Sequence, residues 1–433
     1  MSKSSYGIGI IGFGTVGAGV VAIVQEQADL LAKRLGFGLH IAAIADLDIT
    51  SDRGVSVDPA LLTTDASALI ANPDVDVVVE LVGGTTLAAQ FIEQAMQAGK
   101  PVVTANKALL AEKGPHFYAL AEAQKVGFAF EASVAGGIPV LKALREGLIA
   151  NEIQAVYGIM NGTCNYILDR MEREGLPFDQ VLVEAQEAGF AEAEPSLDVD
   201  GWDTAHKTCV LAALGFDSPI PLDALPVTGI RGVAGEDLHH ARELGYGVKL
   251  LAIIKRQGAQ LLAQVRPTLI PSDHLLGGVH GVFNAVFIQG DQVGDTMFYG
   301  RGAGREPTAS AVVADLCDVC RDLHHDRPGV PPMPPLDQPM TLADAEAVEE
   351  RYYLRTVVAD EPGVMAQITQ CLGNHGVSIA SVIQREQAEG AETAVVLITR
   401  PTSSVEFVQA CAELEDLSIV TGPVVYLPIE DLH

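Results

Sequence analysis

One lysine and a group of carboxylates are spaced for acid–base chemistry on a small substrate. Asp203 and Lys207 stand four residues apart in GWDTAHKTCVLAALG, so on a helix they share one face. Further acids lie just upstream, at Glu192, Glu194, Asp198 and Asp200. Carboxylates suit the ammonium group of an amino acid, and a lysine can exchange a proton with an alcohol as a hydride leaves. Taken alone, these residues are explained more simply as a solvated helix N-terminus, where the helix dipole favours acids.

A glycine-rich loop predicts dinucleotide binding. It is a GxGxxG that follows the strand-like IGII and opens a helix, and it consists of Gly12, Phe13, Gly14, Thr15, Val16 and Gly17. The first glycine permits a tight turn, the second lets the backbone approach a pyrophosphate, and the third lets helix and strand pack closely. The helix N-terminus adds positive partial charge. The alternative is a plain structural turn, and the position between strand and helix argues against it.

An acid that ends the second strand-like run bears on the choice of cofactor. Asp46 occupies this position, with Asp48 nearby and the first base only at Arg53. A carboxylate here bonds the ribose hydroxyls of NAD and repels the 2′-phosphate of NADP. Arg53 could fold back toward that phosphate, so the residues tilt toward NAD and leave NADP open.

The elements that must hold these residues alternate in the first third of the chain. Short β-branched runs such as LHIAAIAD and DVDVVVELVGG are separated by helical stretches, which is the pattern of a parallel sheet wrapped by helices. From about residue 140, helical segments mix with long strand-like runs, which predicts an α+β arrangement. We therefore expect an α/β protein with an N-terminal Rossmann domain and an α+β substrate domain.

A separate C-terminal unit is predicted after a proline-rich run. Six prolines lie between residues 328 and 339, too many for a helix or a central strand, so a stiff linker is expected. The residues beyond follow a β-α-β-β-α-β order, which is ferredoxin-like. The expected domains are 1–135 for the dinucleotide (completed by about 305–327), 136–304 for catalysis and dimerisation, 328–347 as the linker, and 348–433 at the C-terminus.

Composition limits the partners. The 433 residues include 27 Lys plus Arg and 56 Asp plus Glu, a formal charge of −29. Such a surface repels nucleic-acid phosphates and anionic lipid, so neither is expected as a partner. We see no signal-peptide pattern and no apolar run near the ~18 residues that a membrane helix needs. The six scattered cysteines fit reduced thiols. A cytoplasmic location is expected.

Several separated motifs resemble homoserine dehydrogenases. They are VTANKALLA, EASVAGGIPV, NGTCNYIL, GFAEAEPSLDVDGWDTAHK and GRGAGREPTASAVVADL, which come in the family's order within residues 6–325. The resemblance implies reversible oxidation of L-homoserine to L-aspartate 4-semialdehyde with NAD or NADP. It also raises the catalytic interpretation of Lys207 above the solvated-helix alternative. The rival functions are a non-catalytic NAD-binding amino-acid sensor and a dehydrogenase of another small amino acid.

The resemblance also implies roles for individual residues. Lys207 would be the proton donor and acceptor, and Glu192, Asp203 and, more weakly, Asp198 would bind homoserine. The cofactor would contact the glycine-rich loop, Asp46 and a further set: Thr104, Lys107, Gly189 and Gly304. The loop EASVAGGI is similar to the family's sodium loop, which would place Na⁺ at Glu131, Val134, Gly136 and Ile138. Carbonyl oxygens suit such a hard cation.

The C-terminal unit resembles an ACT domain, a small regulatory module that binds amino acids. Its strand-to-helix turn would be Asp360–Val364 and its helix-to-strand return Asn374–Ile379. This implies L-threonine as an effector, bound between subunits of a homodimer or homotetramer, and a module that can be deleted without loss of activity.

Some features depart from the family or stay outside the function. Arg301 and Arg305 are bulky bases near the expected cofactor, where they could contact phosphate or pair with acids, and Ala45 replaces the base that commonly precedes the strand-ending acid. The Cys317–Cys320 pair is expected to be buried, because no second pair stands at zinc spacing. Trp202 is expected to be a packing residue.

Overall fold

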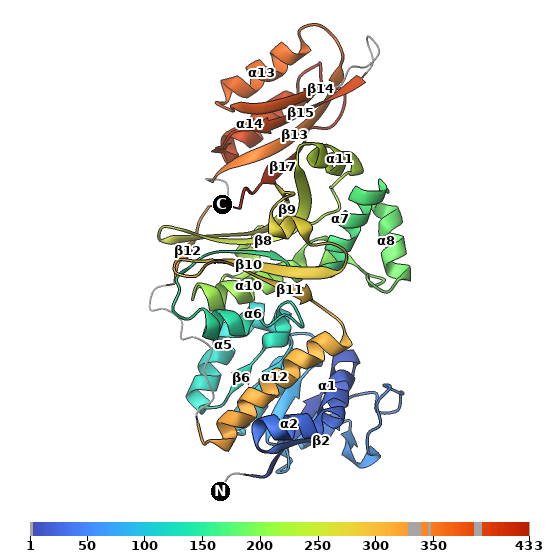
Figure 1. The fold of residues 1–433 in the computed structure, drawn as a ribbon, viewed down its shortest axis with the longest axis vertical. Helices are drawn as coiled ribbons and strands as arrows, with labels where there is room; N and C mark the ends of the chain where they lie inside the picture. Colours follow the sequence, from blue (N-terminus) through green and yellow to red (C-terminus); the bar gives the residue numbers. More distant parts are fainter. Residues whose placement is uncertain (1–2, 328–338, 345–347, 385–391, 433) are drawn as a thin grey trace. The chain divides into compact units, whose positions relative to one another are not determined.

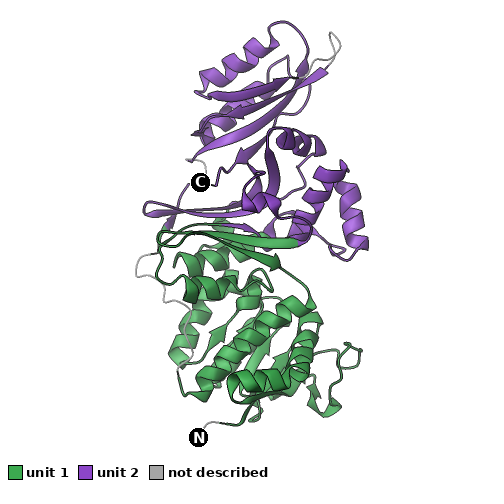
Figure 2. Cartoon of the chain, in the orientation of Figure 1, with its two compact units in different colours: residues 1–156, 204–225, 283–340 green, residues 157–203, 226–282, 341–433 purple. Residues whose placement is uncertain are grey.

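The computed structural model describes residues 3–327, 339–344, 348–384 and 392–432 (Figure 1). The chain divides into two compact units (Figure 2). The first comprises residues 1–156, 204–225 and 283–340, and the second comprises 157–203, 226–282 and 341–433. Most of the expected proline-rich linker, namely 328–338 and 345–347, lies outside the described residues.

The first unit is built on a parallel sheet, as the sequence predicts. Its strands are β1 (Ser5–Ile11), β2 (Gly38–Ala45), β3 (Leu62–Thr63), β4 (Val77–Glu80), β5 (Val102–Thr104) and β6 (Phe128–Ala129). Their order is β3-β2-β1-β4-β5-β6, the doubly wound order of a Rossmann domain. The central strands are Val/Ile-rich and fully buried at Ile8, Ile10, Val77 and Val79, because helices cover both faces.

The helices of the first unit come from both ends of the sequence. They are α1 (Thr15–Glu26), α2 (Ala28–Leu35), α3 (Ala66–Ala71), α4 (Leu87–Gln97), α5 (Lys107–Gln124), α6 (Val140–Lys142) and α12 (Arg305–His324). The late helix α12 packs against α1 and shares its hydrophobic core through Ala309, Val312 and Leu316. The antiparallel hairpin of β10 (Phe283–Gly290) and β11 (Gly294–Arg301) also belongs to this unit. Helix α10 (Trp202–Gly215) continues into it from Asp203.

The second unit contains a long hairpin and a group of helices. Strands β8 (Tyr246–Gln257) and β9 (Gln260–Pro271) pair antiparallel along their full length. The helices are α7 (Gly162–Glu174), α8 (Phe178–Glu187), α9 (Ser196–Val199) and α11 (Gly235–Glu243). Strand β7 (Ile153–Ile159), which begins in the first unit and ends in the second, precedes them. The expected α+β character is confirmed.

Residues beyond 348 form the ferredoxin-like domain that the sequence predicts. Its elements are β13 (Glu349–Ala359), α13 (Val364–Asn374), β14 (Ile379–Gln384), β15 (Glu392–Thr399), β16 (Thr402–Ser403), α14 (Ser404–Glu415) and β17 (Val425–Ile429). The sheet order is β17-β13-β15-β14. Both helices pack on one face of it, around Leu354, Ile368, Leu397 and Phe407.

This domain is not an independent module. Strand β17 pairs parallel with β9 at Ile429 and Leu269, so the two sheets of the second unit are continuous. Within the expected linker, β12 (Thr341–Leu342) also pairs with β9. A shared sheet and a buried ion pair between Arg355 and Asp237 of α11 join the domain to its neighbour. The structure therefore argues against the expectation that the C-terminal residues can be deleted without consequence.

Candidate active site

The glycine-rich loop connects β1 to α1 and presents an open helix N-terminus. Gly12 has φ of 104°, and a Cβ there would approach the carbonyl of Leu81 to 2.6 Å. A Cβ on Gly17 would approach the Gly12 oxygen to 2.1 Å, so close packing requires both glycines. Gly14, by contrast, has no atom within 4 Å of its Cβ position, and it caps α1 without a side-chain bond. The N–H groups of this turn can therefore receive an anionic ligand.

Asp46 stands beside this loop at the carboxyl end of β2. Its carboxylate accepts the Phe13 N–H at 2.5 Å and the Asp48 N–H at 2.9 Å. Asp46, Gly12, Gly14 and Val82 line a cavity of about 580 Å³ at the edge where β1, β2 and β4 end. In a doubly wound sheet, this edge at the β1/β4 switch point is where a dinucleotide binds.

The three non-glycine residues of the loop, Phe13, Thr15 and Val16, differ in their exposure. The Phe13 ring is buried in the hydrophobic core, so only its backbone faces Asp46. Thr15 is exposed and Val16 is half-buried at the start of α1. The loop therefore offers a ligand mainly backbone groups and one hydroxyl.

The arginines expected near the cofactor differ in their contacts. Arg53 pairs with Asp48 at 3.0 Å. Hydrogen bonds from Ser51 and Thr50 lower the pKa of Asp48 below its usual range. Arg305, the first residue of α12, reaches the same loop, because a Cβ on Gly54 would lie 3.6 Å from its Nη1. Arg301 is exposed at the end of β11.

A buried carboxylate that the sequence interpretation missed supports the carboxyl ends of β4 and β5. Glu80 accepts the Thr104 hydroxyl at 2.6 Å and the Val82 N–H at 2.8 Å, and burial raises its pKa. Thr104 is fully buried, so its side chain holds Glu80 instead of facing the cavity. Asn106 caps α5, and Lys107 is the half-buried first residue of that helix. The signal in the sequence that could have identified Glu80 is its position as an acid at the end of a buried strand.

In the second unit, one amide brings two of the expected substrate acids together. Asn161 caps α7, and its Nδ2 donates to Asp198 at 2.7 Å and to Asp203 at 2.8 Å. Asn161 and Asp203 are buried, and Asp198 is half-buried. Lys207, which belongs to the first unit, is also buried and follows Asp203 by one turn along α10. The solvated-helix alternative does not fit buried side chains.

The remaining acids of this segment are separated from the pair. Asp200 pairs with Arg231 at 2.5 Å, and Glu194 accepts from Ser196. Glu192 is exposed, and its carbonyl accepts from Gln186 at 3.0 Å. The structure thus brings Asp198 and Asp203 together and leaves Glu192 on the surface of this unit. Asn161 lies within a motif of the sequence, yet its role as a bridge depends on residues about 40 positions away.

Four further expectations can be placed. Gly189 and Gly304 are exposed, with φ of 74° and 113°, and Gly304 caps α12 without a side-chain bond. Cys317 and Cys320 are buried in α12 as expected, and burial raises the pKa of both thiols. Trp202 is 42% exposed, so its expected packing role is wrong. As the first residue of α10 it stands where the helix meets solvent.

The expected sodium loop is buried and sharply curved. Ala135 and Gly136 have φ of 53° and 46°. Glu131 donates its N–H to Asp315 at 2.8 Å, and its carboxylate accepts the N–H groups of residues 141 and 142. Burial, with repulsion between these two acids, raises the pKa of Glu131 to about 7. Burial raises that of Asp315 to about 6.

Backbone oxygens of this loop are available to a cation. Among the described residues, the carbonyls of buried Val134 and Gly136 accept no backbone hydrogen bond, whereas those of Glu131 and Ile138 accept one each. No group of three or more His, Cys, Asp or Glu side chains in the described part of the chain could hold a metal ion. The loop therefore fits a cation held mostly by carbonyls.

Comparison with known proteins gives the same assignment along the chain. Residues 12–131 match the description "Homoserine dehydrogenase, NAD binding domain", residues 139–317 match "Homoserine dehydrogenase", and residues 352–408 match the ACT domain. The homoserine dehydrogenase of Pseudomonas aeruginosa is 44% identical over 98% of this chain and 99% of its own length. That of Neisseria gonorrhoeae is 42% identical, with the same coverage. The solved structure of a Thiobacillus denitrificans homoserine dehydrogenase is 42% identical, covers 99% of both chains and has a TM-score of 0.89.

The fold, the glycine-rich loop and the matched domains define an NAD(P)-dependent oxidoreductase with a C-terminal ACT domain. The chain belongs to the homoserine dehydrogenase family. Among the described helices, none combines the length and the apolar character needed to cross a membrane.

Proposed function

We propose that this chain interconverts L-homoserine and L-aspartate 4-semialdehyde, with Lys207 as proton donor and acceptor at the substrate oxygen. The observation that carries the proposal is the bridge from Asn161 to Asp198 and Asp203, one helical turn ahead of buried Lys207. A nicotinamide cofactor, when bound at Gly12–Gly17, supplies the hydride acceptor or donor.

The acid pair is suited to an ammonium group. Asn161 holds the two carboxylates at hydrogen-bond distance from one amide nitrogen, so their negative charges repel each other. A substrate ammonium placed between them relieves that repulsion and gains charge-assisted hydrogen bonds. The exposed Glu192 is the third expected substrate residue.

The burial of Lys207 supports a role in proton transfer. When homoserine is oxidised, its hydroxyl oxygen gives a proton to the Lys207 amine while a hydride leaves the carbon that bears this hydroxyl, and the C=O bond forms. In the reverse direction the ammonium returns the proton. Burial of Lys207 keeps bulk water from competing for that proton.

Initial rates with L-homoserine and each cofactor test this function. Lys207→Met should lower kcat by about 10²–10⁴, since that is the usual worth of a general acid–base group, and leave NAD(P) affinity nearly unchanged. The matched control is Lys33→Met on the exposed face of α2. A Lys207→Met variant with wild-type turnover would refute the assignment. Cofactor binding without turnover in the wild type would favour the sensor alternative.

We propose that NAD is preferred over NADP. Asp46 lines the cavity beside the loop, and Arg53 pairs with Asp48. Asp46→Ser should therefore raise kcat/KM for NADP relative to NAD by about tenfold or more, because it removes a charge that repels the 2′-phosphate. Asp52→Ser, in the same loop, is the control. An unchanged cofactor ratio in Asp46→Ser would count against this preference.

We propose a sodium ion on the loop from Glu131 to Ile138. Its support is the pair of buried carbonyls at Val134 and Gly136 and the buried acids Glu131 and Asp315. A cation bound only by the folded chain stabilises it by mass action. The melting midpoint at pH 8 should rise in NaCl relative to choline chloride at equal ionic strength. Equal midpoints in the two salts would exclude sodium.

We propose L-threonine as the effector of the ACT domain, bound at Asp360–Val364 and Asn374–Ile379 between subunits of a homodimer or homotetramer. The support is the matched ACT domain and Gly363, whose φ of 93° forms the turn into α13. Calorimetry with millimolar threonine tests binding, and light scattering gives the subunit number. No heat and no inhibition would exclude threonine.

We propose the domain boundaries 1–135, 136–304 and 348–433, with 305–327 completing the first. The packing of α12 against α1 supports the last point. We also propose a cytoplasmic location, since the six cysteines are buried and the described residues form no disulfide. Limited proteolysis tests the domain boundaries. Thiol titration of the unfolded chain tests whether the cysteines are reduced.

A further inference from the structure

A buried lysine that the proposed reaction does not use lies in the second unit. Lys249, near the start of β8, is 2% exposed, and its side chain reaches α7, which packs against β8. Its Nζ donates to the Val279 carbonyl at 2.6 Å and to Oδ1 of Asn165 at 3.2 Å. Neither acceptor is a carboxylate. Burial lowers the pKa of Lys249, because the charged form loses its water.

Such a lysine is unfavourable for stability. Removal of an amine from water is costly, and two uncharged acceptors offset only part of that cost. An apolar side chain of similar length would pack between β8 and α7 without it. Folding stability alone therefore does not account for the amine of Lys249.

The contacts of Lys249 fix one amide and one backbone turn. Because Oδ1 of Asn165 accepts from Lys249, its Nδ2 faces the other way, where it donates to the carbonyls of Val279 and Gly281 at 3.2 and 2.9 Å. One helical turn further along α7, Asp169 accepts the Gly281 N–H at 3.1 Å. This backbone turn is thus tied to β8 and to two successive turns of α7.

The chain just after this turn lies against the start of α7, where the substrate acids are held. A Cβ on Gly162, the first residue of α7, would approach the Val282 oxygen to 2.8 Å, so the two backbones touch. Asn165 is one helical turn from Asn161, and its N–H donates to the Asn161 carbonyl at 3.1 Å. A shift of this part of α7 would therefore move the Asn161 amide that bridges the two acids.

We propose that Lys249 is a positioning residue for the substrate site. Through Asn165 and the turn at Val279, it fixes the start of α7 and hence the acid pair that Asn161 bridges. The inference rests on the proposed function, because it takes this acid pair to receive the ammonium group of homoserine. Lys249 itself is assigned no contact with the substrate. A displacement of about 1 Å in such a site can lower the rate about 100-fold.

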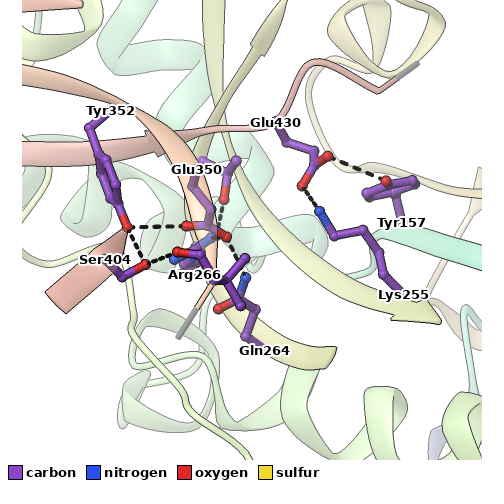
Figure 3. Close-up of polar contacts among 10 residues, drawn as sticks. Tyr157, Lys255, Gln264, Arg266, Glu350, Tyr352, Ser404 and Glu430 are labelled. Carbon is purple, nitrogen blue, oxygen red and sulfur yellow. Dashed lines mark hydrogen bonds and ion pairs between the residues drawn. The ribbon is translucent and has the colours of Figure 1, made fainter. Parts of the chain in front are cut away.

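A second lysine of β8 provides a matched control. Lys255 lies further along the strand, roughly 20 Å from Lys249 at ~3.3 Å per residue, and it pairs with Glu430 at 2.6 Å. Figure 3 shows this pair, in which Glu430 also accepts the Tyr157 hydroxyl at 3.3 Å. Because the partner of Lys255 is a half-buried carboxylate, its loss should lower stability and leave substrate binding unchanged.

Steady-state kinetics and thermal melting of the full chain should therefore separate the two lysines. Lys249→Met should raise the homoserine KM about tenfold or more, with the NAD(P) KM nearly unchanged and a melting midpoint no lower than that of the wild type. Lys255→Met should lower the melting midpoint and keep the wild-type homoserine KM. If the wild type oxidises homoserine and Lys249→Met keeps its KM, this inference alone is overturned. If the wild type does not oxidise homoserine, the proposed function fails first.

Asn165 gives a second test of the same contact. Asn165→Leu should also raise the homoserine KM about tenfold or more, because it removes the amide that links Lys249 to α7. The double variant should raise KM by less than the product of the two single effects, since both side chains act through one contact. Fully multiplicative effects, or loss of folding in both single variants, would show a merely structural role and overturn the proposal.

Discussion

The buried ion pair between α11 and the ACT domain predicts a large and specific loss when one partner is removed. Asp237 is fully buried in the first turn of α11. It accepts Arg355 Nε at 2.6 Å, Arg355 Nη2 at 3.1 Å and the Tyr353 hydroxyl at 2.9 Å. These bonds raise the pKa of Arg355, with the hydrogen bond to Asp237 as the largest cause. Among the described residues, Arg355→Met would leave the buried Asp237 carboxylate with the Tyr353 hydroxyl as its one side-chain donor.

The magnitude follows from the cost of an unpaired buried charge. Removal of one partner of a buried pair costs about 3–5 kcal/mol, whereas an exposed pair is worth about 0–1 kcal/mol. The double variant Asp237→Leu/Arg355→Met removes both charges, so it should regain most of the loss. Arg321→Ala, which breaks an exposed pair with Asp318, is the surface control.

Amide hydrogen exchange is the appropriate assay, because a chain of two units need not unfold in one step. Slowly exchanging amides of β13 in Arg355→Met should exchange roughly a hundred- to a few-thousand-fold faster, which is 3–5 kcal/mol at 1.4 kcal/mol per tenfold. Those of β1 should be unchanged. If β13 exchange in Arg355→Met matches that in Arg321→Ala, or if the double variant is no better than the single one, the reasoning about this pair is refuted.

Three further predictions concern the other sites. Burial raises the pKa of Glu131 from its ordinary 4.5 to about 7, so the folded chain holds this proton more tightly than the unfolded chain. In choline chloride the melting midpoint should therefore fall as pH rises from 5 to 8, and Glu131→Gln should flatten the fall; a parallel curve for that variant would contradict the assignment. Gly17→Ala should abolish NAD(P) binding or lower the melting midpoint by several degrees, since its Cβ would meet the Gly12 oxygen at 2.1 Å; normal cofactor titration would show that the loop can yield. Asn161→Ala should raise the KM for homoserine about tenfold or more, because hydrogen bonds to charged groups are worth about 1.5–3 kcal/mol, and an unchanged KM would remove Asn161 from the substrate site.

The features that were predicted correctly are those that a short stretch of sequence determines. The loop from Gly12 to Gly17 is a short turn, so residue type and spacing specify it. The ferredoxin-like order likewise follows from alternating runs. Asn161 and Glu80 were missed because their roles depend on partners that approach only in the folded chain. The packing role predicted for Trp202 was wrong, because the exposure of a helix's first residue depends on its neighbours in space.

The contacts of the C-terminal domain with β9 were missed for a similar reason. Prolines predict a connection without regular structure, but they do not determine whether the domain beyond it stays separate. The open edge of β9 pairs with β17, a contact between strands more than 150 residues apart. Neither strand alone carries a sequence pattern that identifies the strand with which it pairs.

The pairing of β17 with β9 has a consequence for synthesis of the chain. The ribosome finishes β9 at Pro271 but does not reach Val425 until 154 residues later. At ~5–20 residues per second, that edge waits roughly 8–30 s for its partner. An uncovered edge can pair with other nascent chains. A message truncated before β17 should therefore yield aggregated protein in the cell, whereas a chain that includes β17 covers this edge of β9 with its own strand.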